Sequence, residues 1–144
     1  MKKLFVLALC FVMLFTFAGC GGVKEGDVVK VPVELTKNPG MVAAQFIIEY
    51  DTDKLTLLGY NNGEIFEECE THSTDGKVNV VMVKDFSVSM ADVTKTGTLL
   101  TLKFQVKNGA GKGTIKFKMG DSQFINTNEK EVEPTIKIAD IKVK

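Results

Sequence analysis

Residues 100–106 have the sequence LTLKFQV, in which apolar and polar side chains alternate at every position. A period of two is typical of a β-strand that buries one face and exposes the other. The apolar set therefore predicts an inward face made of Leu100, Leu102, Phe104 and Val106. Residues 29–35, with the sequence VKVPVEL, have the same pattern. Because Pro32 cannot donate a hydrogen bond to a neighbouring strand, we expect this strand to lie at an edge or to contain a bulge.

Further segments of this kind follow along the chain, separated by turn sequences rich in Asn, Asp, Gly and Pro. We expect strands at residues 42–50, 55–60, 77–84, 100–106, 115–119 and 136–143, and a short element at 124–125. Residues 64–73 and 86–96 are weakly patterned and predict loops. The apolar parity changes between Ile138 and Ile141, which predicts a bulge near Ala139 and Asp140. About eight or nine short strands without a helical period indicate an all-β sandwich.

The N-terminus has a different character. Lys2 and Lys3 precede the apolar residues 4–17, and the small residues Ala18 and Gly19 precede Cys20. This layout resembles a bacterial lipoprotein signal, which implies removal of residues 1–19 and lipidation of Cys20. The alternatives are an ordinary secretory signal and a retained membrane helix, for which the apolar stretch is short.

We therefore expect residues 20–23 to form a short tether and residues 24–144 to form one domain, large enough for a single core. The domain would be extracytoplasmic, held to the membrane by lipid on Cys20, or secreted if the signal is an ordinary one. Removal of residues 1–19 takes away two of the 18 basic residues and none of the 18 acidic ones, which leaves a net charge near −2. Without a run of basic residues, nucleic acid and anionic lipid surfaces are poor partners.

The chemistry of an active site is missing from the sequence. His72 is the one histidine, and no serine lies in a nucleophile-elbow motif. Asp51 and Asp53 flank a tight turn and are expected to form it rather than to bind a metal. If Cys20 is lipidated, Cys69 is left alone, so we expect a half-buried thiol and no disulfide. The sequence predicts a binding or structural domain, not an enzyme, with no cofactor or metal.

Four segments together resemble one known family. They are GDVVKVPV at 26–33, FIIEYD at 46–51 followed by Leu55, the apolar strand at 77–85, and GTLLTLKF at 97–104. In this order they resemble a cohesin domain, the module that receives dockerins in cellulosome-like assemblies, over nearly all of residues 24–144. The resemblance implies a jelly-roll sandwich of about nine strands. It also implies a non-catalytic module that docks a dockerin-bearing protein, and the calcium would belong to the dockerin.

The resemblance also implies contact residues, which fall on Ala43, Gln45, Ser73, Val80, Met82, Glu129 and Glu131. At Ala43 and Gln45 the well-studied members have an Asn and an Asp, so a methyl group and a neutral amide replace groups that form specific hydrogen bonds. Ser73 falls near the position of an aromatic contact. These differences put the type of partner in doubt, though not the fold.

The strand at 78–83 supports this face independently, because both of its parities are apolar. A strand in a two-layer sandwich normally exposes polar residues on one side. If Val81 and Val83 face the core, Val80 and Met82 face outward and form a contact patch. The alternative is that the loop at 86–96 covers them.

Two other functions compete with docking of a dockerin. The first is carbohydrate binding, since related sandwiches bind polysaccharides, usually through aromatic platforms. This chain has no Trp, and of its two tyrosines Tyr50 shares the parity of core residues, which leaves Tyr60. The second is a purely structural role in an envelope assembly.

Overall fold

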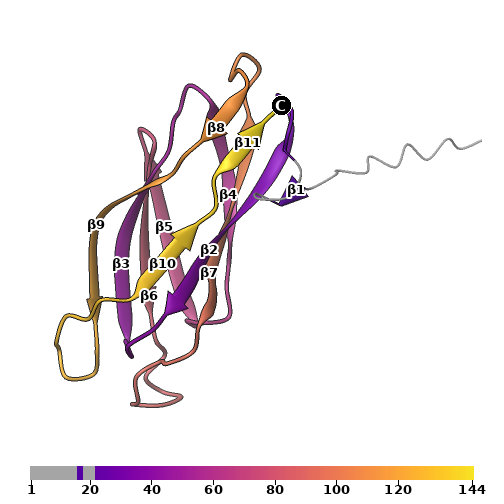
Figure 1. The fold of residues 1–144 in the computed structure, drawn as a ribbon. Coiled ribbons are helices and arrows are strands. Elements are labelled where there is room, and N and C mark those ends of the chain that lie inside the picture. Colours follow the sequence, from indigo (N-terminus) through magenta and orange to yellow (C-terminus); the bar gives the residue numbers. More distant parts are fainter. Residues whose placement is uncertain (1–15, 18–21) are drawn as a thin grey trace, which may run out of the picture.

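The computed structural model describes residues 16–17 and 22–144, and in these residues the secondary structure is β-strand alone (Figure 1). The strands are β1 (Thr16–Phe17), β2 (Val28–Lys37), β3 (Ala43–Glu49), β4 (Leu55–Asn62), β5 (Glu68–Thr74), β6 (Lys77–Val83), β7 (Gly97–Val106), β8 (Gly113–Ile115), β9 (Lys118–Ile125), β10 (Thr135–Ile138) and β11 (Ile141–Val143). None of the described segments forms a helix long and apolar enough to cross a membrane.

The strands form two facing layers, as the all-β sandwich prediction requires (Figure 1). One sheet has the order β1-β2-β7-β4, with β10 also on β2, and the other has the order β5-β6-β3-β9. A two-stranded pair of β8 and β11 completes one end. Neighbours are antiparallel except β1 and β2. Buried apolar residues from both layers form one core, so the predicted sandwich is confirmed.

The alternating strands face as the sequence predicts. The four residues predicted to face inward in each of these strands are buried at 0–1 % exposure, namely Leu100, Leu102, Phe104 and Val106 of β7 and Val29, Val31, Val33 and Leu35 of β2. Pro32 has no N–H to donate, but this does not interrupt pairing on the side of β2 that faces away from β7. On that side β1 pairs with residues 29–30 and β10 pairs with residues 33–37. The β2–β7 register shifts between Val33 and Glu34, where Leu99 of β7 is the extra residue. The β2–β10 register shifts at Thr36, so β2 itself contains the expected irregularity.

Predictions of strand boundaries are wrong in three places, two of which lie before residue 126. Residues 64–73 were expected to be a loop, but β5 occupies most of that range as an edge strand. Its inward side carries Cys69, Thr71 and Ser73 in place of large apolar residues, so its alternation is weak. The expected strand at 115–119 is divided, since β8 pairs with β11 whereas β9 pairs with β3. The expected short element at 124–125 is the end of β9.

The bulge expected near Ala139 and Asp140 is instead a break between two strands, so the change of parity marks the right place but the strand expected at 136–143 is divided. There β10 ends at Ile138 and β11 begins at Ile141, and the pairing partner changes from β2 to β8. If β8–β9 and β10–β11 are each counted as one strand, the eleven described strands become nine.

The start and the end of the domain lie side by side. Val23 N donates to Lys142 O at 2.8 Å, and Lys144 N donates to Val23 O at 2.9 Å. Cys20 and the predicted signal lie outside the described residues, apart from the two residues of β1. Because every described core residue lies between Val23 and Val143, residues 22–144 carry the whole described core.

Candidate docking face

The outward side of the β5-β6-β3-β9 sheet carries the candidate site, which we call the docking face. Its centre is defined by the outward residues of β3 and β6, namely Ala43, Gln45, Ile47, Asn79, Val81 and Val83. The ladder aligns them in rows across the sheet. In one row Gln45 lies between Val81 of β6 and Gln123 of β9, and Glu70 of β5 lies beyond Val81.

Apolar side chains are exposed at the centre of the docking face. Val81 is 38 % exposed, which places it among the few large apolar residues at the described surface. Ala43 and Val83 form the next row and are half-buried, and Ile47 is half-buried on the other side of Gln45. An exposed apolar group with a polar rim is typical of a protein-binding surface.

The prediction that Val80 and Met82 face outward is wrong, since both are fully buried in the core. Val80 pairs with buried Phe46 and Met82 pairs with buried Ala44, so the even-numbered residues of β6 point inward. The alternative that the 86–96 loop covers them is also wrong. The polar residues of this strand show which side is solvated, because Lys77 and Asn79 have the parity of Val81.

Three of the seven predicted contact residues lie on or beside the docking face. Ala43 and Gln45 are part of it, and Glu131 is held at its β9 edge, where its Oε1 accepts a hydrogen bond from Gln123 Nε2 at 3.0 Å. Glu129 lies farther out, in the exposed turn after β9 with a φ of 57°. Ser73 pairs with buried Val78 and so has the inward parity, on the other side of the sheet.

The sequence prediction missed an acidic rim of the docking face, formed by Glu68 and Glu70 of β5, because it assigned that strand to a loop. Glu68 pairs with Val83 and Glu70 pairs with Val81, which places both carboxylates along the apolar centre. The alternation in ECETHST, residues 68–74, is the signal that would have placed them. His72 lies on the same edge, exposed and hydrogen-bonded to Thr74 at 3.1 Å.

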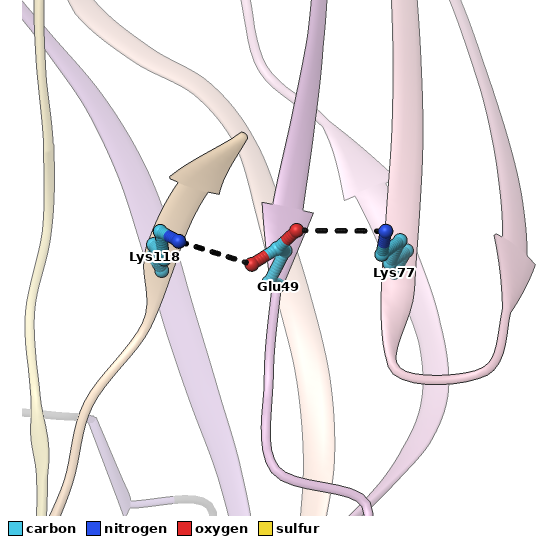
Figure 2. Close-up of polar contacts among 3 residues, drawn as sticks. All are labelled: Glu49, Lys77 and Lys118. Atoms are coloured by element: carbon cyan, nitrogen blue, oxygen red, sulfur yellow. Dashed lines mark ion pairs between the residues drawn. The ribbon is translucent and has the colours of Figure 1, made fainter. Parts of the chain in front are cut away.

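An ion-pair cluster lies at one end of the docking face (Figure 2). Glu49 of β3 lies between Lys77 of β6, at 3.7 Å from Oε1, and Lys118 of β9, at 3.9 Å from Oε2. Both lysines are largely exposed, so these pairs contribute little to stability. Their effect is local, because they occupy both oxygens of the Glu49 carboxylate.

Asn79 is the polar residue that the fold satisfies least well. Its Oδ1 is buried and accepts no hydrogen bond within the described part of the chain. It lies opposite Ile47 of β3 and His72 of β5, in the middle of the docking face. A buried acceptor without a donor costs about 1–3 kcal/mol. Such a cost in the centre of a binding surface is consistent with a role in binding rather than in folding.

At the other end of the sheet, a loop of residues 84–96 exposes three apolar side chains. Phe86, Val88 and Met90 are 45 %, 71 % and 74 % exposed. The base of the loop is well anchored, because Lys84 is buried and its Nζ donates to Ala91 O. Asp85 N also donates to Glu67 Oε2 at 3.1 Å, and this bond lowers the pKa of the Glu67 carboxyl.

The remaining sequence expectations concern single residues. Cys69 is half-buried, as expected, and burial raises the pKa of its thiol to about 11. Asp51 forms its turn through a hydrogen bond from Asp53 N at 2.9 Å, and Tyr50 packs against Phe104 with ring centroids 5.0 Å apart. Tyr60 is 40 % exposed, on the opposite sheet from the docking face. No cluster of three potential metal ligands occurs among residues 16–17 and 22–144.

Comparison with known proteins identifies the family. The model of the cohesin domain family matches residues 15–143, so the chain belongs to the cohesin family. Cohesin domains are non-catalytic binding modules, which confirms the prediction that the chain is not an enzyme. No curated protein is detectably similar to the chain in sequence.

Solved cohesin structures share the fold at low sequence identity. The sixth cohesin of scaffoldin B from Acetivibrio cellulolyticus, solved with a Cel5 dockerin mutant, is 22% identical with a TM-score of 0.75, over 89% of this chain and 96% of that chain. The OlpA cohesin from Clostridium thermocellum, solved with Doc918, is 20% identical with a TM-score of 0.76, over 89% and 96%. A non-cellulosomal cohesin from the archaeon Archaeoglobus fulgidus is 14% identical with a TM-score of 0.69, over 89% and 88%.

Proposed function

We propose that this chain is a dockerin receptor that binds its partner through the docking face. The observation that carries the proposal is the exposed apolar centre at Val81, lined by Glu68 and Glu70, on the open sheet of a cohesin domain. Apolar side chains buried at the centre of an interface supply much of its binding energy, and charged rims direct encounter and orientation. Two of the solved cohesins with this fold, from Acetivibrio cellulolyticus and Clostridium thermocellum, are in complex with dockerins.

The function of such a receptor is to hold its partner in place. A tethered module raises the effective concentration of a bound enzyme or surface protein without any chemistry of its own. Polysaccharide degradation or cell-surface assembly are the processes in which this would act. Because Ala43 and Gln45 replace more strongly hydrogen-bonding residues, the partner is expected to be selected by apolar contact and by charge.

The tether is a further part of the proposal. Residues 1–19 act as a lipoprotein signal and Cys20 carries the lipid, which places the domain outside the cytoplasm. Support comes from the Ala18-Gly19-Cys20 sequence after the apolar residues 4–17. Labelling of cells with an alkynyl fatty acid tests this, since Cys20→Ser should abolish incorporation while Cys69→Ser should retain it. Equal labelling of both variants would exclude a lipid on Cys20.

The docking proposal is tested by titration of residues 22–144 against dockerin modules from the same genome, with calcium and with chelator. Dockerins fold around calcium, so saturable binding that disappears with chelator is expected. Val81→Asp should abolish it, whereas Leu58→Asp should not, because Leu58 is a similarly exposed apolar residue on the opposite sheet. No binding across the panel, or binding to insoluble polysaccharide instead, would overturn the proposal in favour of a structural or carbohydrate-binding role.

A further inference from the structure

The β3–β9 ladder contains a bulge in the middle of the docking face. Phe46 pairs with Ser122 and Ile48 pairs with Met119, so that Gly120 and Asp121 together lie opposite Ile47. Two residues opposite one is the arrangement of a β-bulge, which bends the strand and redirects side chains. Here it separates β9 from β3 beside Ile47.

A hollow of about 300 Å³ lies at this bulge, lined by Gln45, Ile47, Asp121, Ser122 and Gln123. Gly120 helps to keep it open. A Cβ at that position would lie 3.2 Å from Ile47 Cβ and 3.6 Å from Glu49 Oε1, so any larger residue would press on the wall of the hollow. The hollow is therefore a consequence of the bulge and of one residue without a side chain.

The charge of the hollow comes from Asp121. Its side chain is exposed and makes no hydrogen bond or ion pair with any residue of 16–17 and 22–144. The neighbouring acids are engaged, since Glu49 pairs with two lysines and Glu131 accepts a hydrogen bond from Gln123. Asp121 is thus the carboxylate at this hollow that is open to a ligand.

The lining combines two kinds of surface. Ile47 supplies an apolar wall, whereas Asp121 and the amide oxygens of Gln45 and Gln123 supply acceptors. Lysine and arginine have the matching chemistry, because an apolar stem carries a cationic donor at its end. A neutral polar side chain would leave the carboxylate unpaired once water is displaced.

We propose that this hollow receives one long cationic side chain of the docked partner, with its stem against Ile47 and its head on Asp121. The inference rests on the proposed docking function and adds a specificity determinant to it. The ion-pair cluster at Glu49 carries a net positive charge nearby, but its two ammonium groups are drawn toward Glu49. Charge-assisted hydrogen bonds to Asp121 give the selectivity.

A probe that needs no partner tests the hollow itself. Residues 22–144 are titrated with N-acetyl-arginine amide, N-acetyl-lysine amide and the uncharged N-acetyl-citrulline amide. Binding is monitored by the NMR chemical shifts of the backbone amides. We expect saturable shifts at Ile47, Asp121 and Gln123 with the two cations, at least fivefold weaker with citrulline. The stronger of the two cations indicates whether the partner residue is arginine or lysine.

Two variants separate charge from shape. Asp121→Asn should weaken cation binding at least fivefold, and Gly120→Ala should weaken it by narrowing the hollow while the charge is unchanged. Asp75→Asn is the matched control, because it removes one exposed carboxylate at the β5–β6 turn. Thermal unfolding confirms that each variant is folded. Equal binding of citrulline, or cation binding unaffected by Asp121→Asn, would overturn the proposal.

The partner is tested separately. With a dockerin that binds the wild-type chain, Asp121→Asn should raise the Kd about tenfold, and replacement of the contacting basic residue by Ala should remove that difference. A change below twofold would show that the partner does not use the hollow. If the cation probes bind but no dockerin does, the docking function fails and the cation preference of the hollow stands on its own.

Discussion

Met82 of β6 lies opposite Ala44 of β3 with both side chains buried, whereas Val81, one residue earlier, lies opposite Gln45 and is 38 % exposed. Two consecutive apolar residues therefore belong to different surfaces. One closes the core and the other forms the centre of the docking face. Because the sheet separates core from partner, substitutions at these two positions should have opposite effects on stability and on binding.

Val81→Asp should leave the domain folded and abolish docking, whereas Met82→Asp should unfold it. A carboxylate on the solvated side costs little stability, but in the partner interface it replaces an apolar contact that contributes about 1.5–3 kcal/mol. A charge at the buried Met82 position has no partner, and its desolvation costs several kcal/mol. Circular dichroism and calorimetric titration distinguish the two effects. A folded Met82→Asp protein that has lost binding would contradict this assignment.

Asn79→Val should stabilise the free domain or leave it unchanged. The substitution removes the buried Oδ1 that has no hydrogen-bond donor, and a β-branched residue suits a strand, so we expect a gain of up to about 1 kcal/mol. Urea denaturation measures it. Asn61→Val, at an exposed position on the other sheet, serves as the comparison. A clear loss of stability would mean that Asn79 contributes to folding.

Cys69 should react slowly with thiol reagents while the domain is folded. Because burial raises its pKa from 9.0 to about 11, the reactive thiolate is about 100-fold scarcer than in an ordinary thiol below pH 9. Labelling with an aromatic disulfide at pH 8, with and without urea, measures the ratio. Similar rates in both conditions would show that the thiol is accessible.

The same shift links Cys69 to stability at high pH. Between about pH 9 and 11 the folded state retains the thiol proton while the unfolded state loses it, so the stability falls as the pH rises through this range. Below about pH 9 the thiol is protonated in both states, so the contribution of Cys69 to the stability of the fold is fully present. Cys69→Ala should flatten this part of the stability profile, which urea denaturation between pH 7 and 11 records.

Lys84 should matter for the 84–96 loop beyond its charge. Lys84→Met keeps the apolar stem and loses the hydrogen bond to Ala91 O, so we expect a cost of about 1 kcal/mol. Lys84→Ala also removes buried packing and should cost about 2–3 kcal/mol. Both variants should exchange the amide hydrogens of residues 86–91 faster than wild type. Unchanged exchange would show that the loop is held by its other contacts.

The strands and the core were predictable where one face alone is apolar. From Val29 to Leu35 and from Leu100 to Val106 the period of two assigns every side chain to the correct side, because a one-residue slip would expose the whole apolar set. It does not extend to Leu99, which is buried next to Leu100 where the β2–β7 register shifts. The resemblance to the cohesin family could also be recognised from the sequence, because it rests on short segments of these strands and on their order along the chain. The change of parity located the irregularity at Ala139 and Asp140, although it predicted a bulge where the structure divides the strand.

The docking face was predictable only in part. Ala43 and Gln45 were placed on it, but β6 is apolar on both sides, and its pattern could be matched in two ways. The edge strand β5 has no large inward residue that would mark it as a strand. A strand at the edge of a sheet buries fewer of its side chains than a central strand does. Its alternation of apolar and polar residues is therefore weaker in the sequence.

By itself, the sequence determined the all-β architecture, the single apolar core and the absence of catalytic motifs, because these depend on local period and on residue type. Only the tertiary structure decided which side of β6 faces solvent, that Glu68 and Glu70 border its apolar residues, and that a bulge opens a hollow beside Ile47. These features depend on register between strands that are distant in sequence. Register is set by the packing of the whole sandwich and not by any one strand.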